Sequence, residues 1–383
     1  MRFPGFTGGW ESRKIGEDCS VLMCKRIFAH QTSEQGDVPF YKIGTIGAEP
    51  DAYISRELFE DYKAKYNYPR EGEVMVTCAG TVGKTIVFNG DDSYYQDSNI
   101  VWLSNPKQLY LNSFLNYYLS RVNWNKLNST TITRIYNDNL RELIIKYPSV
   151  EEQEKIVSLL SLLDQRIAVQ NKVIEDLKKL KTALCTELFS HGRTISTSFS
   201  EIGTYFSADN LSKEELSDFG TECILYGELF TTYGRVITDV KSRTSRRINN
   251  ATTLSQSIDL LFPASTTVDA ISLISPSAII KPGVILGGDM FGIRLSNKYN
   301  NQYMSNLLYY CYRFKLASYA QGSTIIHLHY KDIEKIKITV HPKENQDRIV
   351  AILALQDNRI ANEQRIVNAY TNQKANLIRQ MFI

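Results

Sequence analysis

The sequence predicts a mixed α/β (α+β) fold in which two globular lobes, related by an internal repeat, are separated by two long antiparallel coiled-coil helices. Two helical segments that align with each other at a constant offset predict the repeat. An apolar heptad in the first segment predicts the coiled coil. Strand-like runs ahead of each segment predict the lobes. The length of 383 residues fits two or three domains at about 150 residues each.

The repeat is clearest in the segments that begin at Pro148 and at Pro342. The matched pairs are Gln153 with Gln346, Ile156 with Ile349, Asp164 with Asp357, Lys181 with Lys374, and Phe189 with Phe382. The expected domains are therefore lobes at 1–148 and 192–341, and helices at 149–191 and 342–383. The interiors of the two halves, near 48–100 and 231–288, match poorly, which indicates a shared frame with divergent inserts.

Both helical segments show a heptad seam, interrupted at equivalent places by Lys181 and Lys374. A helix of about 38 residues spans about 57 Å, so we expect it to reach between the lobes and to pair with its antiparallel copy. The alternative is that each helix packs onto its own lobe. The expected seam residues are Ile156, Leu160, Leu163, Ile167, Ile174 and Leu177 in the first helix, and Ile349, Leu353, Ile360 and Val367 in the second.

Each lobe is expected to place strands before a shorter helix. In the first half, strand-like runs at 73–77, 84–88 and 98–103 precede a helix at 111–121. In the second half, runs at 278–281, 283–286 and 290–295 precede a helix at 302–314.

Composition narrows the class of protein. Net charge is only +3, from 44 basic and 41 acidic residues, so any basic surface must be local. No run approaches the roughly 18 apolar residues of a membrane span, and the N-terminus lacks a signal-peptide core, so we expect a cytoplasmic protein without membrane contact. The six cysteines form no Cys-x-x-Cys pair and are expected to be buried thiols.

Catalytic motifs are missing from the sequence. Gly80 and Gly83 stand too close together for a phosphate loop, and strand-like residues follow them instead of a helix. No two prolines are adjacent, as an adenine methyltransferase motif would require, and Glu nowhere stands two residues before Lys, as in common nucleases. His327 and His329 lack partners for a metal site. We therefore expect no catalytic residue, no bound metal and no cofactor in this chain.

Several basic and hydroxyl-bearing residues are candidates for holding nucleic acid, because Arg, Lys, Ser and Thr contact phosphates and Arg can also bond guanine. The densest basic stretch contains Arg235, Lys241, Arg243, Arg246 and Arg247, although a solvated charge run is the alternative. The repeated frame adds Ser129, Thr130 and Arg134 in the first half and Ser323, Thr324 and His327 in the second. The loops that differ between the two halves are where we expect a particular nucleic-acid sequence to be recognised. They add Thr77, Thr81 and Lys84 in the first half, and residues 265–267 are the nearest counterpart in the second.

Together these features resemble the DNA-specificity subunit of type I restriction-modification enzymes, over essentially the whole chain. The N-terminal signature, the entry to each long helix and two loops of the first lobe carry the resemblance. These motifs are Arg2 to Thr7 followed by Trp10-Glu11, Pro148 with Glu151 to Ile156 and its echo from Pro342 to Ile360, Gly36 to Gly44, and Gly80 to Lys84. The second helix departs from the pattern in having Asn345 before Gln346 and one residue fewer.

The resemblance implies a non-catalytic subunit whose two target-recognition domains each bind one half of a bipartite, asymmetric double-stranded DNA sequence. The helices would set the spacer and dock two methylation (M) subunits, which use S-adenosylmethionine. Restriction (R) subunits would cut and translocate DNA with ATP and Mg. Two other classes remain open at this point: a self-sufficient DNA methyltransferase or nuclease, and a two-lobed coiled-coil scaffold that binds only proteins.

Overall fold

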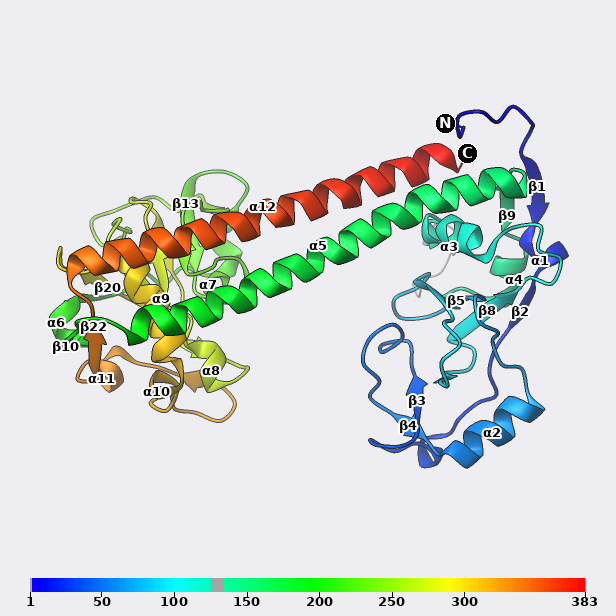
Figure 1. Cartoon of the computed structure of the whole chain (residues 1–383). Helices are drawn as coiled ribbons and strands as arrows, with labels where there is room; N and C mark the ends of the chain where they lie inside the picture. The colour runs from blue at the N-terminus through cyan, green and yellow to red at the C-terminus, as the bar shows by residue number, and fades with distance from the viewer. Residues whose placement is uncertain (1, 125–133, 383) are drawn as a thin grey trace. The chain divides into compact units, whose positions relative to one another are not determined.

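The computed structural model describes residues 2–124 and 134–382, and it divides into two compact units (Figure 1). Unit 1 consists of Met1–Asn171 and Arg365–Ile383, and unit 2 of Lys172–Gln364. The unit boundaries cut through both long helices, α5 (Val150–Ser190) and α12 (Lys343–Met381). Each unit therefore contains one lobe and half of each helix, so the compact units differ from a linear division into lobes and helices.

The lobe of unit 1 contains a four-stranded sheet in the order β2-β8-β5-β6 and a three-stranded sheet in the order β4-β3-β7. The strands and the helix expected from the sequence are found as β5, β6, β8 and α3. The elements are β1 (Glu11–Lys14), α1 (Ile15–Asp18), β2 (Ser20–Leu22), β3 (Val38–Tyr41), β4 (Tyr53–Ile54), α2 (Arg56–Lys65), β5 (Val74–Thr77), β6 (Thr85–Val87), β7 (Tyr94–Tyr95), β8 (Ile100–Ser104), α3 (Asn112–Ser120), α4 (Asn137–Arg141) and β9 (Ile144–Tyr147), with a 3-10 turn, η1, at Ala29–Gln31.

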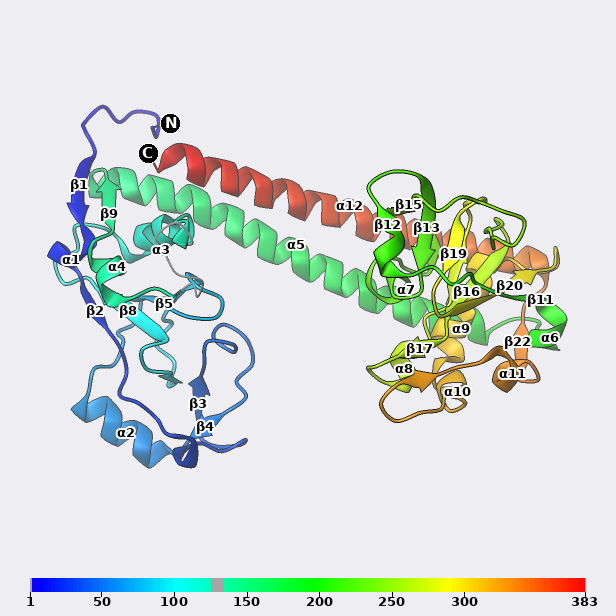
Figure 2. The same ribbon diagram turned by 180° about the vertical axis from the view of Figure 1, so that it is seen from behind.

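The lobe of unit 2 contains a five-stranded sheet in the order β11-β20-β16-β18-β14 and a four-stranded sheet in the order β12-β15-β13-β19 (Figure 2). The expected elements are found as β18, β19, β20 and the pair α9 and α10. The elements are β10 (Ile195–Ser198), α6 (Phe199–Ile202), β11 (Gly203–Ser207), η3 (Lys213–Glu215), β12 (Leu216–Ser217), β13 (Thr221–Leu225), α7 (Glu228–Thr231), β14 (Val236–Ile237), β15 (Ser242–Thr244), β16 (Asp259–Pro263), β17 (Ser265–Thr266), α8 (Ala270–Leu273), β18 (Ser277–Ile279), β19 (Ile285–Gly287), β20 (Met290–Leu295), α9 (Asn301–Cys311), α10 (Arg313–Ala317), β21 (Ile326–His327), α11 (Tyr330–Ile333) and β22 (Lys337–Val340).

The two lobes share a frame. In unit 1, β1 pairs antiparallel with β9, a four-residue helix follows, and β2 then pairs with β8. In unit 2, β10 pairs antiparallel with β22, a four-residue helix follows, and β11 then pairs with β20. The smaller sheets differ in strand number and order. The internal repeat predicted from the sequence is thus present as a common frame with divergent interiors.

A buried glutamine ties the start of each long helix to its lobe. The Gln153 side chain accepts a hydrogen bond from the Leu111 backbone N–H, 2.8 Å away, and donates to the carbonyls of Leu109 and Pro148. Leu111 caps the N-terminus of α3. Because this side chain is fully buried, its amide replaces water as the partner of three backbone groups.

Gln346 makes the equivalent tie in unit 2. Its side chain accepts from the Asn300 backbone N–H at 2.8 Å and donates to the carbonyls of Lys298 and His341. Asn300 is the N-cap of α9, the counterpart of α3. The repeat therefore preserves one contact between a long helix and a lobe helix.

Each long helix ends in the core of the unit where the other begins. Phe382, at the end of α12, packs in unit 1 with ring centres 4.9 Å from Phe114. Phe189, at the end of α5, packs in unit 2 with ring centres 5.5 Å from Tyr303. The matched phenylalanines of the sequence repeat thus perform the same packing role.

Within each unit the two helix segments run antiparallel and are joined by an ion pair. In unit 1, Asp164 of α5 lies 2.5 Å from the Lys374 ammonium of α12, and Arg166 lies beside Tyr370 one turn earlier in α12. In unit 2, the Lys181 ammonium lies 2.5 Å from Asp357. The polar residues that interrupt the seam therefore pair with the aspartates that the repeat preserves.

The seam residues are buried, but they do not all lie between the helices. Ile156 and Leu160 belong to the core of the unit 1 lobe, as Ile349 and Leu353 belong to that of unit 2. The first turns of each helix therefore pack onto its own lobe. The alternative interpretation of the sequence expected such packing along the whole of each helix. The remaining seam residues are buried or half-buried along the helices; these are Leu163, Ile167, Ile174, Leu177, Ile360 and Val367.

We predict that Gln153→Ala destabilises unit 1 by about 3 kcal/mol, because three buried backbone groups lose their hydrogen-bond partner. All three tryptophans lie in unit 1, so the urea unfolding curve detected by tryptophan fluorescence reports this unit. Gln373→Ala, at an exposed site of α12, is the control and should leave the curve unchanged. A loss for Gln153→Ala no larger than that of the control would contradict the assigned tie.

Candidate nucleic-acid interface

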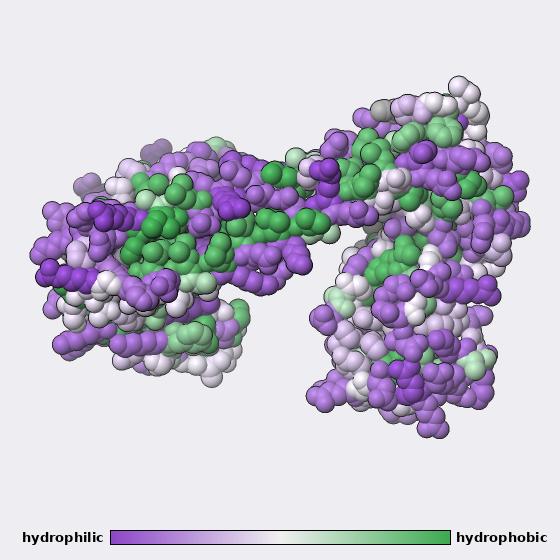
Figure 3. Space-filling model, viewed as in Figure 1, coloured by the Kyte–Doolittle hydropathy of each residue, from purple (hydrophilic) through white to green (hydrophobic). Residues whose placement is uncertain are grey.

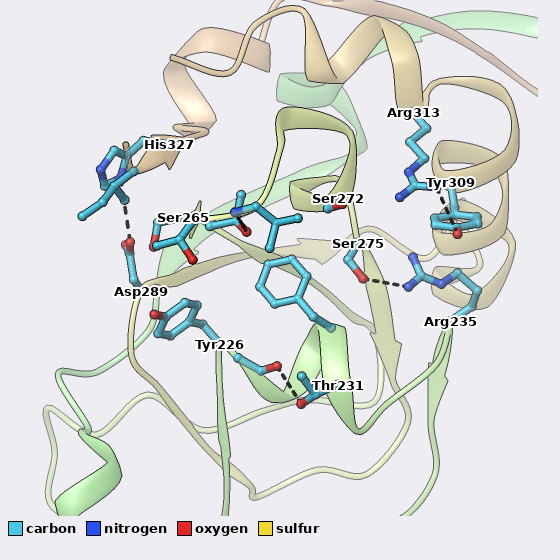
Figure 4. A pocket seen from close by; sticks show the side chains of 16 residues that line it. Tyr226, Thr231, Arg235, Ser265, Ser272, Ser275, Asp289, Tyr309, Arg313 and His327 are labelled. Atoms are coloured by element: carbon cyan, nitrogen blue, oxygen red, sulfur yellow. Dashed lines mark hydrogen bonds and ion pairs between the residues drawn. The ribbon is translucent and has the colours of Figure 1, made fainter. Parts of the chain in front are cut away.

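A cleft of about 750 Å³ in unit 2 is lined by basic and hydroxyl side chains (Figure 4). It lies between the end of β13 and α7 on one side and β17, α8, α10 and β21 on the other. The residues that line the cleft include Arg235, Ser265, Thr266, Thr267, Ser275, Asp289, Tyr309, Arg313 and His327.

Strand pairing brings distant parts of the sequence to this cleft. β17 pairs antiparallel with β21, which places Ser265 opposite His327 and Thr266 opposite Ile326. Arg235 stands just before β14, which pairs with β18, and its backbone carbonyl accepts a hydrogen bond from Ser305 of α9. Two predicted contact residues, Arg235 and His327, and the noted loop 265–267 are therefore gathered in one place.

The arginines of the cleft are held by neutral acceptors. Arg235 donates to the Pro276 carbonyl at 2.9 Å and to the Ser275 hydroxyl at 2.8 Å. Burial lowers the pKa of the Arg235 guanidinium to about 10, so the group stays charged at neutral pH. Asp289 is the one acidic residue among those that line the cleft, and it lies 3.9 Å from His327. The cleft consequently keeps an excess of positive charge.

Some of the basic residues after Arg235 form ion pairs with glutamates. Arg243 donates to the Gly220 carbonyl at 3.1 Å and lies 3.5 Å from Glu222, while Arg246 lies 3.2 Å from Glu215. Lys241 and Arg247 are exposed. Ion pairing with glutamate offsets part of the positive charge of Arg243 and Arg246. Lys241 and Arg247 are therefore better placed to bind a polyanion.

Ser323 and Thr324 are exposed in the turn that leads into β21. Gly322 has φ +121°, and a Cβ there would lie 2.0 Å from the Ile325 carbonyl oxygen. This glycine is required by the close approach of the backbone. The turn therefore presents both hydroxyl side chains at the surface beside a strand that lines the cleft.

In unit 1 the glycine-containing loop that follows β5 is fixed from inside. Thr77 is fully buried, and its hydroxyl bonds to the backbone of Thr81 and Lys84, so it supports the loop and cannot reach a ligand directly. This corrects its assignment as a contact residue. Gly83 has φ +80°, and a Cβ there would lie 2.0 Å from the Trp124 ring. Thr81 is exposed at the tip.

Lys84 is also exposed, and its ammonium donates to the Ile46 carbonyl at 2.6 Å. Arg134 donates to the Ser98 carbonyl at 3.2 Å and lies over the Tyr136 ring. Ser129 and Thr130 lie outside the described residues. Lys84 in unit 1 and Arg235 in unit 2 are thus both predicted contact cations that donate to a backbone carbonyl.

Sequence reasoning missed Tyr309 and Arg313 as site residues. Tyr309 lies at the end of α9 and Arg313 opens α10, and both line the cleft. A signal was available, because they match Tyr117 and Arg121 in the repeat. The repeat matches indicated the shared frame, but they did not indicate a cleft that is lined partly by the frame and partly by the divergent segment 231–288.

A second candidate surface lies on the long helices. Leu162 in unit 1 and Leu355 in unit 2 occupy matched positions of the repeat, and their exposed fractions are 54% and 69%. Figure 3 shows hydrophobic surface gathered along the part of the long helices that belongs to unit 2. Leu162 and Leu355 are therefore exposed apolar side chains at matched positions of the two helices, unlike the seam residues buried in the lobe cores.

The described residues contain neither a membrane-spanning helix nor a cluster of metal ligands. No helix among them is long and apolar enough to cross a membrane. Nor do three or more His, Cys, Asp or Glu side chains within residues 2–124 and 134–382 gather as metal ligands.

Two comparisons by sequence identify relatives. The model of the type I restriction modification DNA specificity domain matches residues 7–179 and 234–371. A Haemophilus influenzae protein described as a type I restriction enzyme specificity subunit is 46% identical over 164 residues, which cover 43% of this chain and 42% of that protein. A Methanocaldococcus jannaschii specificity subunit is 26% identical over 218 residues, covering 51% and 49%. The matched segments thus span less than half the length of these curated relatives.

Two solved structures share the fold. The S subunit of a type I restriction-modification system from M. genitalium is 18% identical, with a TM-score of 0.57 over 98% of this chain and 96% of that one. A chain from a structure on complex assembly of a type I R-M system gives 17% identity and a TM-score of 0.57 over the same shares. The family model covers well over half of the chain, in both halves of the repeat. The chain belongs to the type I restriction-modification DNA specificity family.

Proposed function

We propose that this chain is the sequence-specific DNA-binding subunit of a type I restriction-modification complex. Each lobe would bind one half of a bipartite, asymmetric duplex target. The observation that carries the proposal is one frame used twice with divergent interiors, where cations held by neutral acceptors line the surface in both lobes. A shared frame suits two related tasks, and different interiors suit two different base sequences.

The proposed partners are the methylation and restriction subunits that the family resemblance implies. Methylation subunits would dock on the helices, and the matched exposed leucines Leu162 and Leu355 favour two copies of one partner. Restriction subunits would join to cut and translocate DNA. S-adenosylmethionine, ATP and Mg would be bound by those partners, and this chain would itself catalyse no step. Such a complex would work in the cytoplasm, where the DNA is.

The assigned role predicts salt-dependent DNA binding without turnover. The purified chain together with its methylation subunits should bind duplex DNA, with affinity falling steeply as salt rises because phosphate contacts release counterions. Given S-adenosylmethionine and Mg, the chain alone should transfer no methyl group and cut no DNA, whereas addition of the methylation subunits should produce methyladenine. Turnover by the chain alone would favour a self-sufficient enzyme, and absence of DNA binding would favour a protein scaffold.

The matched leucines give a separate test of partner docking. Leu162→Asp and Leu355→Asp should each remove about one methylation subunit from the complex seen by native mass spectrometry, because a carboxylate would be desolvated in an apolar contact. The double variant should remove both. Thr182→Asp, at an exposed site of α5, is the control for added charge. Full assembly of the double variant would exclude this surface.

A further inference from the structure

One tyrosine ring in the cleft of unit 2 lies against two arginines. The guanidinium carbon of Arg235 lies 4.2 Å from the centre of the Tyr309 ring, and that of Arg313 lies 4.6 Å from it. Figure 4 shows the ring between the two guanidinium groups. Cation–π contact holds each arginine, but it leaves both charges in place.

Within the described residues, neither arginine donates a hydrogen bond to a carboxylate, although Asp269 at the N-cap of α8 interacts electrostatically with Arg313. Arg235 bonds to a carbonyl and a hydroxyl, and Arg313 bonds through Nε to the Ile271 carbonyl at 2.9 Å. Two like charges in a partly buried cleft repel each other, and desolvation adds to the cost. An arrangement that is unfavourable in the free protein becomes favourable when an anion enters the cleft.

The two arginines have different capacities for a ligand. Both terminal nitrogens of Arg235 already donate hydrogen bonds within the protein. The role of Arg235 is therefore to hold the Tyr309 ring through the cation–π contact. Arg313 uses Nε for Ile271 and one Nη1–H for the Tyr309 hydroxyl, 3.2 Å away. A guanidinium has five N–H groups, and within the described residues Nη2 and the second Nη1–H of Arg313 have no recorded hydrogen bond. These groups can donate to an acceptor with two oxygens.

We propose that Arg313 binds a phosphodiester of the DNA backbone at this cleft, with Tyr309 and Arg235 as positioning residues. A phosphodiester carries a full negative charge and would neutralise part of the excess positive charge of the cleft. The edge of a guanine is neutral and would not. The hydroxyls of Ser265, Thr266 and Thr267 line the same cleft and suit the remaining phosphate oxygens. The inference rests on the proposed DNA-binding function and assigns one contact within it.

The test compares Arg313→Gln with Lys315→Gln in the chain assembled with its methylation subunits. Lys315 lies on the same short helix and donates to the Lys337 carbonyl, so its replacement removes an equal charge outside the cleft. Affinity is measured across a salt series for a duplex that the complex methylates and for an unrelated duplex of equal length. Arg313→Gln should weaken both by about tenfold and lower the salt slope by about 0.9. Lys315→Gln should change neither.

Two further variants separate contact from positioning. Arg313→Lys keeps the charge and should restore the salt slope while regaining only part of the affinity, because the fork is lost. Tyr309→Phe keeps the ring and should weaken binding of both duplexes with the slope unchanged. An effect of Arg313→Gln confined to the methylated duplex would overturn the phosphate assignment in favour of base recognition. No difference from Lys315→Gln would overturn the contact itself, whereas failure of the wild-type complex to bind would overturn the proposed function instead.

Discussion

The first turn of each long helix contains a glutamine whose side chain is buried and whose amide bonds three backbone groups of its own lobe. Gln153 and Gln346 fix the helix start to the N-terminus of a lobe helix, and therefore fix the direction in which the long helix leaves. A hydrophobic contact could slide, because burial has no direction, whereas an amide bonded on both ends has one orientation. The geometry of each unit depends on this tie.

The far end of each helix is fixed differently. Phe189 and Phe382 insert into a core, and ion pairs between matched residues join the helices within each unit. Lys181 is almost buried while Asp357 is half-exposed, so that pair contributes more to register than to stability. The lysines that interrupt the heptad thus make the antiparallel pairing of α5 with α12 specific, because each lysine pairs with an aspartate of the other helix. A uniformly apolar seam would not fix the register in this way.

The sequence was sufficient for the frame and insufficient for the cleft. Periodicity and repeat matching predicted the two long helices, the strands around 73–103 and 278–295, and the antiparallel pairing, because these depend on local patterns. The roles of Thr77 and Arg243 could not be predicted, since burial and a glutamate partner are set by distant residues. Arg313 was missed for the same reason: its neighbours Ile271 and Tyr309 are brought to it by the fold.

If two lobes on one frame bind two different half-sites, the DNA methylated by the complex must carry a two-part motif. Mapping methylated adenines in the genome of a strain that carries this chain with its partners tests this most directly. We expect one motif made of two unlike specific parts that are separated by a fixed number of unspecified bases, with a methylated adenine in each part. Deletion of the chain should abolish methylation of this motif. A single uninterrupted motif, or methylation that persists without this chain, would contradict it.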